Sequence, residues 1–255
     1  ELLQEWDWTE HFAPQPEKER YLNYVADKFG LRADIQLNAR VQSAVFDEKG
    51  IMWFTLQNSN MVGRLDPETG DIKLVTLSTP DSKPYGIKID AEGVPWFSCN
   101  GRPCLYKIDP ATMALTEFKL PLGGTTVRRL DIAEDGMIWY VNSGRGQLGR
   151  YNPKTGEIKE WPSPSGPKSH PYAIAVIDDI VWYNESGMRP EPLVRFDPKT
   201  ETFQSWAIPS GEIHAGIIRH MRPTRDGNLL IHQSSTNRII LVTLNRSTTT
   251  QQARR

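Results

Sequence analysis

Short apolar runs separated by polar turns follow one another along most of this chain. In the best-defined stretch the apolar runs are Tyr85–Asp90, Val94–Ser98, Leu105–Ile108 and Leu115–Leu120. The turns between them contain Gly93, Asn100-Gly101 and Asp109-Pro110. Short runs bounded by such residues are typical of β-strands joined by tight turns. The pattern predicts a unit of four antiparallel strands.

This unit repeats with a constant period. Trp53, Trp96, Trp139 and Trp182 follow one another at intervals of 43 residues, each at the start of an aromatic run. A weaker unit has Leu230 at that position, 48 residues after Trp182. A period near 43 residues with four strands is typical of a β-propeller blade. We therefore expect an all-β fold, an incomplete propeller of four to five four-stranded blades.

One tryptophan per unit, placed on the second strand, also predicts its role. A large ring at this position can fill the space between neighbouring sheets, so packing is the expected role rather than ligand stacking. Residues 144–149 spell G-x-G-x-x-G, but an Asn-Pro turn follows them where a dinucleotide site would have a helix. We interpret this stretch as a hairpin of the third unit.

The first 46 residues lack the repeat and are expected to form a separate α/β extension. A helix is predicted over Glu17–Phe29, with strands at Ile35–Leu37 and Val41–Phe46. We expect this extension to supply no regular blade. The repeats then occupy residues 47–244, and the polar residues 245–255 are expected to form a disordered tail.

Composition excludes several classes of function. Lys plus Arg is 30 and Asp plus Glu is 31, a balance that argues against nucleic-acid binding. No apolar run is long enough to cross a membrane, and no signal peptide is visible, so a cytoplasmic location is the default expectation. Cys99 and Cys104 could face each other across a predicted hairpin. A disulfide between them is geometrically possible, and a reduced pair is the default expectation.

Residues 1–46 resemble a segment of the Baeyer–Villiger flavin monooxygenases of the cyclohexanone type. The matching stretches are E-L-L-Q-E-W-D-W-T-E at residues 1–10, the sequence of Tyr21–Gln36, and R-V-Q-S-A-V at Arg40–Val45. Such enzymes bind FAD and NADPH through glycine-rich turns, and this segment has no glycine before Gly30. We therefore expect neither FAD nor NAD(P) to bind here.

Residues 47–244 resemble the streptogramin lyase (virginiamycin B lyase) propellers. The resemblance is carried by W-F-T-x-x-N-S-N-M-V-G-R-L-D-P-x-T-G at Trp53–Gly70, and by P-Y-G-I and P-Y-A-I at residues 84–87 and 171–174. It implies a seven-bladed fold, of which this chain shows four good units and one weak one. The change of resemblance near Val45 suggests a chimeric or truncated chain.

This resemblance also implies carbon–oxygen lyase chemistry linked to antibiotic resistance. In such lyases magnesium polarises the ester carbonyl of a cyclic depsipeptide, and a histidine removes the α-proton before the lactone C–O bond breaks. The family's catalytic motifs are Glu-Pro-His-Gly-Ile and Trp-Phe-x-Glu. Where the histidine is expected, this chain has Tyr85, Arg128, Tyr172 and Arg219. Where the carboxylate is expected, it has Leu56, Cys99, Asn142, Glu185 and Gln233.

Only Glu185 keeps the chemistry of the family motif. Two histidines are candidate bases: His170, and His214 within Glu-Ile-His-Ala. We take His214 as the candidate base, with Glu185 as its catalytic partner and Glu185 and Glu212 as magnesium ligands. The two tyrosines and two arginines at the histidine position could instead bind a carboxylate, phosphate or lactone. They could equally pair with Glu185 or other acids.

Three interpretations of function follow. The first is a streptogramin-lyase-like protein with weak or no activity. The second is a non-catalytic ligand-binding or scaffold propeller that uses the Tyr/Arg positions, because one fold hosts many functions. The third is an inactive recombined fragment of a flavin monooxygenase. In the first two interpretations the expected partner is a small molecule.

Overall fold

The computed structural model describes residues 6, 7, 9, 14–34, 41–121, 126–208, 217–233 and 238–245. The chain divides into two compact units, Glu1–Ala39 and Arg40–Arg255. In the described part, no helix is long and apolar enough to span a membrane.

The first unit contains the predicted helix. Helix α1 covers Gln15–Lys28, begins after Pro14, and is followed by the 3-10 helix η2 at Leu31–Asp34. The buried carboxylate of Glu17 accepts hydrogen bonds from the backbone N–H of Thr9 (2.8 Å) and from its hydroxyl (2.6 Å). The prediction of one helix here is confirmed, whereas the strand predicted at Ile35–Leu37 lies outside the described residues.

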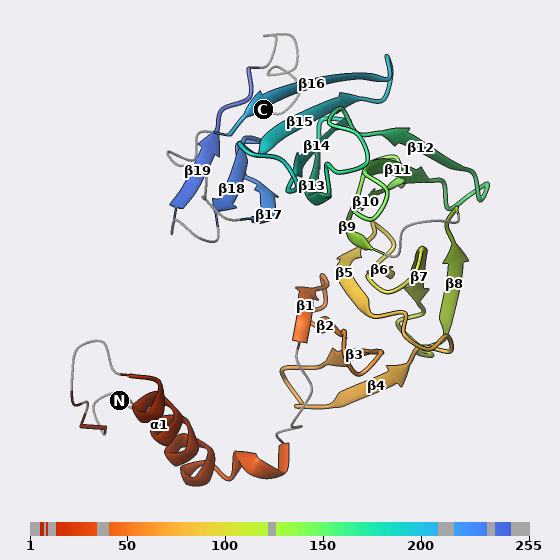
Figure 1. The fold of residues 1–255 in the computed structure, drawn as a ribbon. Coiled ribbons are helices and arrows are strands. Elements are labelled where there is room, and N and C mark those ends of the chain that lie inside the picture. Colours follow the sequence, from red (N-terminus) through yellow and green to blue (C-terminus); the bar gives the residue numbers. More distant parts are fainter. Residues whose placement is uncertain are drawn as a thin grey trace. The chain divides into compact units, whose positions relative to one another are not determined.

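The described residues of the second unit form five antiparallel sheets, each built from strands consecutive in sequence (Figure 1). Blade one contains β1 (Val41–Phe46), β2 (Met52–Leu56), β3 (Met61–Leu65) and β4 (Ile72–Thr76). Blade two contains β5 (Pro84–Ile89), β6 (Pro95–Cys99), β7 (Cys104–Ile108) and β8 (Leu115–Lys119). Blade three contains β9 (Val127–Ile132), β10 (Ile138–Asn142), β11 (Gln147–Tyr151) and β12 (Ile158–Pro162).

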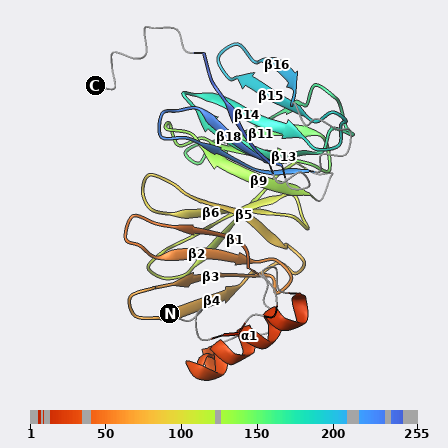
Figure 2. The ribbon, with the colours of Figure 1, turned by 90° about the vertical axis from the view of Figure 1, so that its left-hand side faces the viewer.

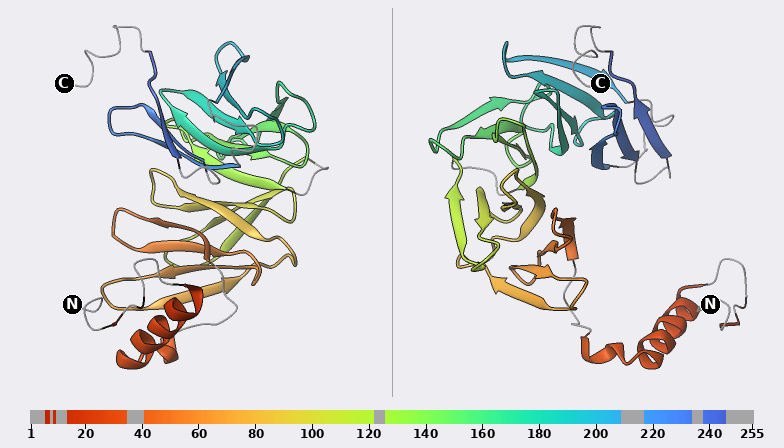
Figure 3. Two further views of the ribbon diagram at one scale, coloured as in Figure 1. Left: turned by 60° about the vertical axis from the view of Figure 1, so that its left-hand side comes forward. Right: turned by 180° about the vertical axis from the view of Figure 1, so that it is seen from behind.

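Blade four contains β13 (Pro171–Ile177), β14 (Ile180–Glu185), β15 (Pro192–Asp197) and β16 (Thr202–Ala207). The described strands of blade five are β17 (Ile218–Pro223), β18 (Leu229–Gln233) and β19 (Arg238–Val242). The first strands of successive blades contact one another, and the side and rear views show the sheets following each other in order (Figures 2 and 3). The predicted all-β propeller of about five blades is confirmed.

The first strand of blade one differs from the expectation. Residues 41–46 form β1, which pairs with β2 from Val41 opposite Leu56 to Phe46 opposite Met52. The strand predicted at Val41–Phe46 is therefore confirmed, but it belongs to the first blade rather than to the N-terminal extension. The backbone of this segment completes the first sheet, and Val45 packs against the core between blades one and two. The two units accordingly meet at residues 39 and 40, earlier than the predicted boundary after residue 46.

The repeated tryptophans fill the spaces between blades, as predicted. Each lies on the second strand of its sheet, and all four are at most 7% exposed. Each belongs to a separate hydrophobic core that also contains residues of the following blade. The indole N–H groups of Trp53 and Trp96 donate to Asp47 (3.1 Å) and Asp90 (2.8 Å) in the preceding turns. The constant period therefore reflects packing between sheets.

The G-x-G-x-x-G stretch is a hairpin, as interpreted from the sequence. Gly146 has a φ of +65° in the turn between β10 and β11, a conformation that favours glycine. Gly149 lies opposite Tyr140, whose ring would meet any side chain at that position. The Tyr140 hydroxyl donates to Glu160 (2.9 Å). Both glycines therefore serve the sheet.

The two cysteines differ from the expected reduced pair. Cys99 ends β6 and Cys104 begins β7, and the two are joined by a disulfide bond with their Cα atoms 5.4 Å apart. The hairpin places the two residues at the same end of adjacent strands, within the usual Cα separation of a disulfide.

Candidate functional site

The first strand of each blade, which we call the inner strand, contains one structurally equivalent position. In every blade the first residue of the inner strand pairs with the last residue of the second strand, as in Pro84 opposite Cys99. A register irregularity follows directly, and such bulges redirect side chains. The residues at this irregularity are Gln42, Tyr85, Arg128, Tyr172 and Arg219. The equivalence inferred from the motif thus agrees with the strand register.

Three of these side chains meet in a cluster, which we call the Tyr–Arg cluster: Tyr85, Arg128 and Tyr172. The two phenol oxygens share a short hydrogen bond, and the rings are perpendicular with centroids 6.3 Å apart. The Arg128 guanidinium lies 4.9 Å from the Tyr172 ring centroid and 5.8 Å from that of Tyr85. These distances are those of cation–π contacts. Both tyrosines are buried.

Among the described residues, no acidic group pairs with the positive charge of the cluster. Arg129 lies beside it, with its guanidinium 5.4 Å from the Tyr85 ring centroid. The Nε atoms of Arg128 and Arg129 are buried and lack a hydrogen-bond partner in the described part of the chain. Neither arginine forms an ion pair with a described carboxylate. The alternative in which Arg128 pairs with Glu185 is not what the structure shows.

Titratable groups around the cluster are shifted by burial and by this charge. Burial and the hydrogen bond with Tyr85 raise the pKa of Tyr172 to about 12. Desolvation and the charges of Arg129 and Arg222 lower the pKa of His220 to about 4. The His220 Nε2 atom lies 3.4 Å from Nη2 of Arg129. Because a guanidinium can only donate, Nε2 of the neutral imidazole accepts and Nδ1 carries the proton.

His220 was not among the residues predicted from the sequence. It follows Arg219 on β17 and is equivalent in register to Arg129 on β9. The sequence did contain a clue, because His220 directly follows the position at which the family motif predicts a histidine. A cavity of about 30 Å³ lies here, lined in part by Lys88, Arg129, His220 and Arg222. That volume suits water or a small anion and is far below the usual size of a drug-binding pocket.

Arg219 does not join the cluster in this structure. Its side chain is exposed, and it makes no hydrogen bond, ion pair or ring contact with the other described residues. It contributes positive charge near His220.

Glu185 is a buried structural carboxylate. It ends β14 and is fully buried. Its Oε1 accepts hydrogen bonds from the Ser163 hydroxyl (2.5 Å) and the Ser165 backbone N–H (3.0 Å), and its Oε2 accepts one from the Ser165 hydroxyl. Both oxygens are thus occupied by neighbouring donors.

The described residues do not fit a magnesium site. At the positions equivalent to Glu185, Leu56 is apolar, Cys99 is disulfide-bonded, and Asn142 and Gln233 carry no charge. In the described ranges no three His, Cys, Asp or Glu side chains gather closely enough to hold a metal ion. His214 and Glu212 lie outside these ranges. Their predicted roles are therefore untested, and we derive no reaction step through a metal.

The other candidate base, His170, is held by the backbone. Its Nδ1 lies 3.0 Å from the carbonyl oxygen of Ser143, and its own carbonyl accepts a hydrogen bond from the Ser186 hydroxyl (2.6 Å). These contacts are those of a loop residue that links two blades.

The family follows from comparison with known proteins. The model of the virginiamycin B lyase family matches residues 31–253. The chain belongs to this family. It is similar in fold to the catalytically inactive virginiamycin B lyase from Staphylococcus aureus with quinupristin, with a TM-score of 0.70 and 24% identity. That match covers 81% of this chain and 71% of the other. A streptogramin B lyase structure gives a TM-score of 0.69 at 22% identity, covering 83% and 71% of the two chains.

A second set of relatives matches only a short segment. Acetone monooxygenase (methyl acetate-forming) of Gordonia sp. (strain TY-5) is 49% identical over 53 residues, which are 21% of this chain and 10% of that protein. Cyclopentanone 1,2-monooxygenase of Comamonas sp. (strain NCIMB 9872) is 43% identical over 53 residues, with the same two shares. The predicted resemblance to flavin monooxygenases is confirmed. The chain spans about a tenth of the length of these relatives.

Proposed function

We propose that this protein is a ligand-binding member of the virginiamycin B lyase family, which holds a small anionic molecule at the Tyr–Arg cluster and has little or no lyase activity. One observation carries the proposal. Arg128 stacks on two buried, hydrogen-bonded tyrosines and has no described acidic partner. A guanidinium without an acidic partner can bind an anion.

The polar groups of the cluster match an anion. Arg128 and Arg129 can only donate hydrogen bonds, and each has a buried Nε without a described partner. A carboxylate or phosphate oxygen would satisfy these donors, whereas a neutral apolar ligand would leave them unpaired. Inorganic phosphate is therefore a suitable first probe.

The cluster is poorly suited to removing a proton at neutral pH. An efficient general base has a pKa near the working pH. The pKa of Tyr172 is about 12, so its phenol stays protonated, and arginine stays charged. His220 is neutral, but its pKa of about 4 makes it a weak base.

Family membership favours a second candidate function, carbon–oxygen lyase activity on a cyclic depsipeptide lactone. It would require His214 as the base, with Glu212 and Glu185 as the carboxylates predicted to bind magnesium. Glu185 supports this function least, because serine donors occupy its oxygens. Antibiotic resistance would follow only from this second function.

The experiment that separates the two functions uses the full chain and quinupristin with magnesium, followed by mass spectrometry. Elimination opens the ring without changing the mass, so the linear product is recognised by its retention time and fragmentation. We expect no conversion, together with phosphate binding that Arg128→Gln weakens. Rapid conversion that is lost in His214→Ala would establish the lyase and contradict our proposal.

We also propose that the joined monooxygenase-like and propeller segments are a recombined chain. Sequencing the intact genomic locus and its transcript tests this, because two separate transcripts would contradict the proposal.

A further inference from the structure

The bulges of the inner strands contain a second equivalent position, directly after the one that forms the Tyr–Arg cluster. In blades two to five the residues at this position are Gly86, Arg129, Ala173 and His220. A Cβ atom at Gly86 would lie 3.1 Å from the Cα atom of Arg129 and 3.4 Å from its Cγ atom. Glycine in blade two therefore leaves the room in which Arg129 lies.

These residues and those directly after them line the small cavity beside the cluster. Its volume is about 30 Å³, and its lining comes from the inner strands of blades two to five. About 10–15 Å³ of such volume holds one water-sized atom, so the cavity has room for about two of them. A carboxylate group has two oxygen atoms. The cavity therefore matches the space that one carboxylate requires.

Three hydrogen-bond donors line this cavity: Arg129, His220 and Arg222. The Nε atom of Arg129 is buried without a described partner. Because Nε2 of His220 accepts from Arg129, the donor of this imidazole is Nδ1–H. Arg222 is exposed and forms no ion pair or hydrogen bond with the described residues. Desolvation and the charges of both arginines lower the pKa of His220 to about 4, which agrees with the proximity of the three groups.

Asp131, on the same strand as Arg129, does not supply an acidic partner for these arginines. Its Oδ1 lies 2.8 Å from Nζ of Lys88, and its Oδ2 accepts a hydrogen bond from the backbone N–H of Val176 (2.9 Å). Lys88 also lines the cavity, and this ion pair neutralises it. The guanidiniums of Arg129 and Arg222 remain without a described acidic partner, so the lining carries an excess of positive charge.

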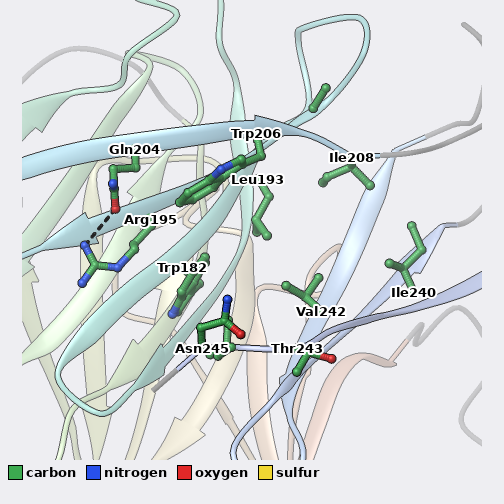
Figure 4. Close-up of a pocket in the computed structure, with 12 residues that line it drawn as sticks. Trp182, Leu193, Arg195, Gln204, Trp206, Ile208, Ile240, Val242, Thr243 and Asn245 are labelled. Atoms are coloured by element: carbon green, nitrogen blue, oxygen red, sulfur yellow. Dashed lines mark hydrogen bonds between the residues drawn. The ribbon is translucent and has the colours of Figure 1, made fainter. Parts of the chain in front are cut away.

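Another cavity, of about 490 Å³ between blades four and five, differs in its lining (Figure 4). Most of its lining residues are apolar: Trp182, Leu193, Trp206, Ile208, Ile240 and Val242. The charged residue of that lining, Arg195, donates a hydrogen bond to Gln204 (3.3 Å) and pairs with Asp197 (3.4 Å). An anion would have to displace Asp197 to bind there, whereas the arginines beside the Tyr–Arg cluster have no such partner.

We propose that the ligand of this protein carries two anionic groups, one at the Tyr–Arg cluster and one, a carboxylate, at a second anion position formed by Arg129, His220 and Arg222. This inference rests on the proposed function and adds the second position to it. The guanidiniums of Arg128 and Arg129 lie 5.8 and 5.4 Å from the centroid of the same Tyr85 ring, so one small molecule can reach both. The ligand class is small dicarboxylates and phosphorylated carboxylates.

Succinate and its monomethyl ester are matched probes, because they share a carbon chain and differ by one negative charge. We expect the full chain to bind succinate at least about tenfold more tightly than the ester in isothermal titration calorimetry at about pH 7, in the range of a charge-assisted hydrogen bond. Arg222→Gln changes an exposed residue, so the variant should fold. It should reduce the preference to less than about threefold and weaken phosphate binding by less than about threefold.

The control variant is Arg195→Gln, which removes the same charge from the lining of the cavity in Figure 4. It should keep the preference for succinate. The imidazole signals of His220 in NMR, assigned with His220→Gln, report on the second anion position itself. They should shift when succinate binds, and Arg222→Gln should abolish this shift.

The outcomes separate this inference from the proposed function. Equal affinity for succinate and its ester, with phosphate still bound and weakened by Arg128→Gln, would overturn the second anion position and leave the proposed function intact. A preference that Arg195→Gln removes as fully as Arg222→Gln does would reflect overall charge and would also overturn the second position. Failure of both phosphate and succinate to bind would contradict the proposed function, and this inference with it.

Discussion

The phenol oxygens of Tyr85 and Tyr172 share a hydrogen bond although the two residues lie 87 positions apart in the chain. They come from the inner strands of blades two and four, and Arg128 from blade three stacks over both rings. The contact arises because bulges at equivalent register positions direct all three side chains to one place. The positions at which the sequence resemblance predicts a histidine here hold a compact cationic and phenolic group.

The phenol pair gives a prediction in which two substitutions act in opposite directions. Tyr85→Phe removes a hydrogen bond that raises the pKa of Tyr172, so this pKa should fall from about 12 toward the ordinary tyrosine value. Arg128→Gln removes a positive charge that lowers it, so the pKa should rise. NMR titration of the labelled tyrosine ring carbon measures both. Tyr106→Phe, in blade two outside the cluster, should leave the pKa of Tyr172 unchanged.

The two arginines of the predicted set should differ in their effect on anion binding. Arg128→Gln should weaken phosphate binding at least about tenfold, in the range of a lost charge-assisted hydrogen bond. Arg219→Gln should weaken it less than about threefold, because this exposed residue is separate from the cluster and is screened by solvent. Isothermal titration calorimetry with inorganic phosphate measures both. Equal losses would show that Arg219 shares the site.

Glu185 should behave as a structural residue rather than a metal ligand. Glu185→Gln replaces one acceptor oxygen by a donor group, and we expect a loss of about 1–3 kcal/mol in the free energy of unfolding. Glu157→Gln, at an exposed ion pair with Arg150, should change it by less than about 0.5 kcal/mol. Urea denaturation with and without magnesium measures these values. Stabilisation by magnesium that is lost only in Glu185→Gln would contradict the prediction.

Substitutions at the repeated tryptophan position should lower the free energy of unfolding most where two blades enclose the side chain. Trp139→Ala removes a ring that is 3% exposed between blades three and four, so we expect it to lower the free energy of unfolding by about 3–5 kcal/mol. Leu230 occupies the equivalent position in blade five but is 39% exposed. Leu230→Ala should therefore cost less than about 1.5 kcal/mol. Similar losses in the two variants would show that Leu230 is covered in solution.

Glu191 should make stability depend on pH. Burial raises its pKa from 4.5 to about 7, although it accepts a hydrogen bond from the backbone N–H of Ile218 (3.1 Å). The folded state thus keeps this proton over a range in which the unfolded state has lost it. Protonated Glu191 therefore makes its full contribution to the free energy of unfolding below pH 4.5. This contribution is at most about 3 kcal/mol, and it is lost as the pH rises through 7.

Glu191→Gln removes that titration. The difference in the free energy of unfolding between the protein and this variant should therefore change between pH 4.5 and 8, and denaturation at several pH values measures it. A difference that is constant with pH would contradict the raised pKa.

The sequence by itself determined the propeller, its period and the position of each tryptophan. These features depend on short-range patterns: strand alternation, Asp-Pro and glycine turns, and one large ring per unit. The hairpin nature of residues 144–149 was also visible locally, because a turn follows them where a nucleotide site would have a helix.

Only the tertiary structure decided which chemical groups meet. The hydrogen bond of Tyr85 with Tyr172, the serine donors on Glu185 and the contact of His220 with Arg129 all join different strands or blades. The pairing of Val41–Phe46 with β2 and the cavity beside Val242 likewise depend on the sheet register and on what covers each edge. Local sequence patterns determine the strands, but the bulges and the packing between sheets determine where side chains from distant positions converge.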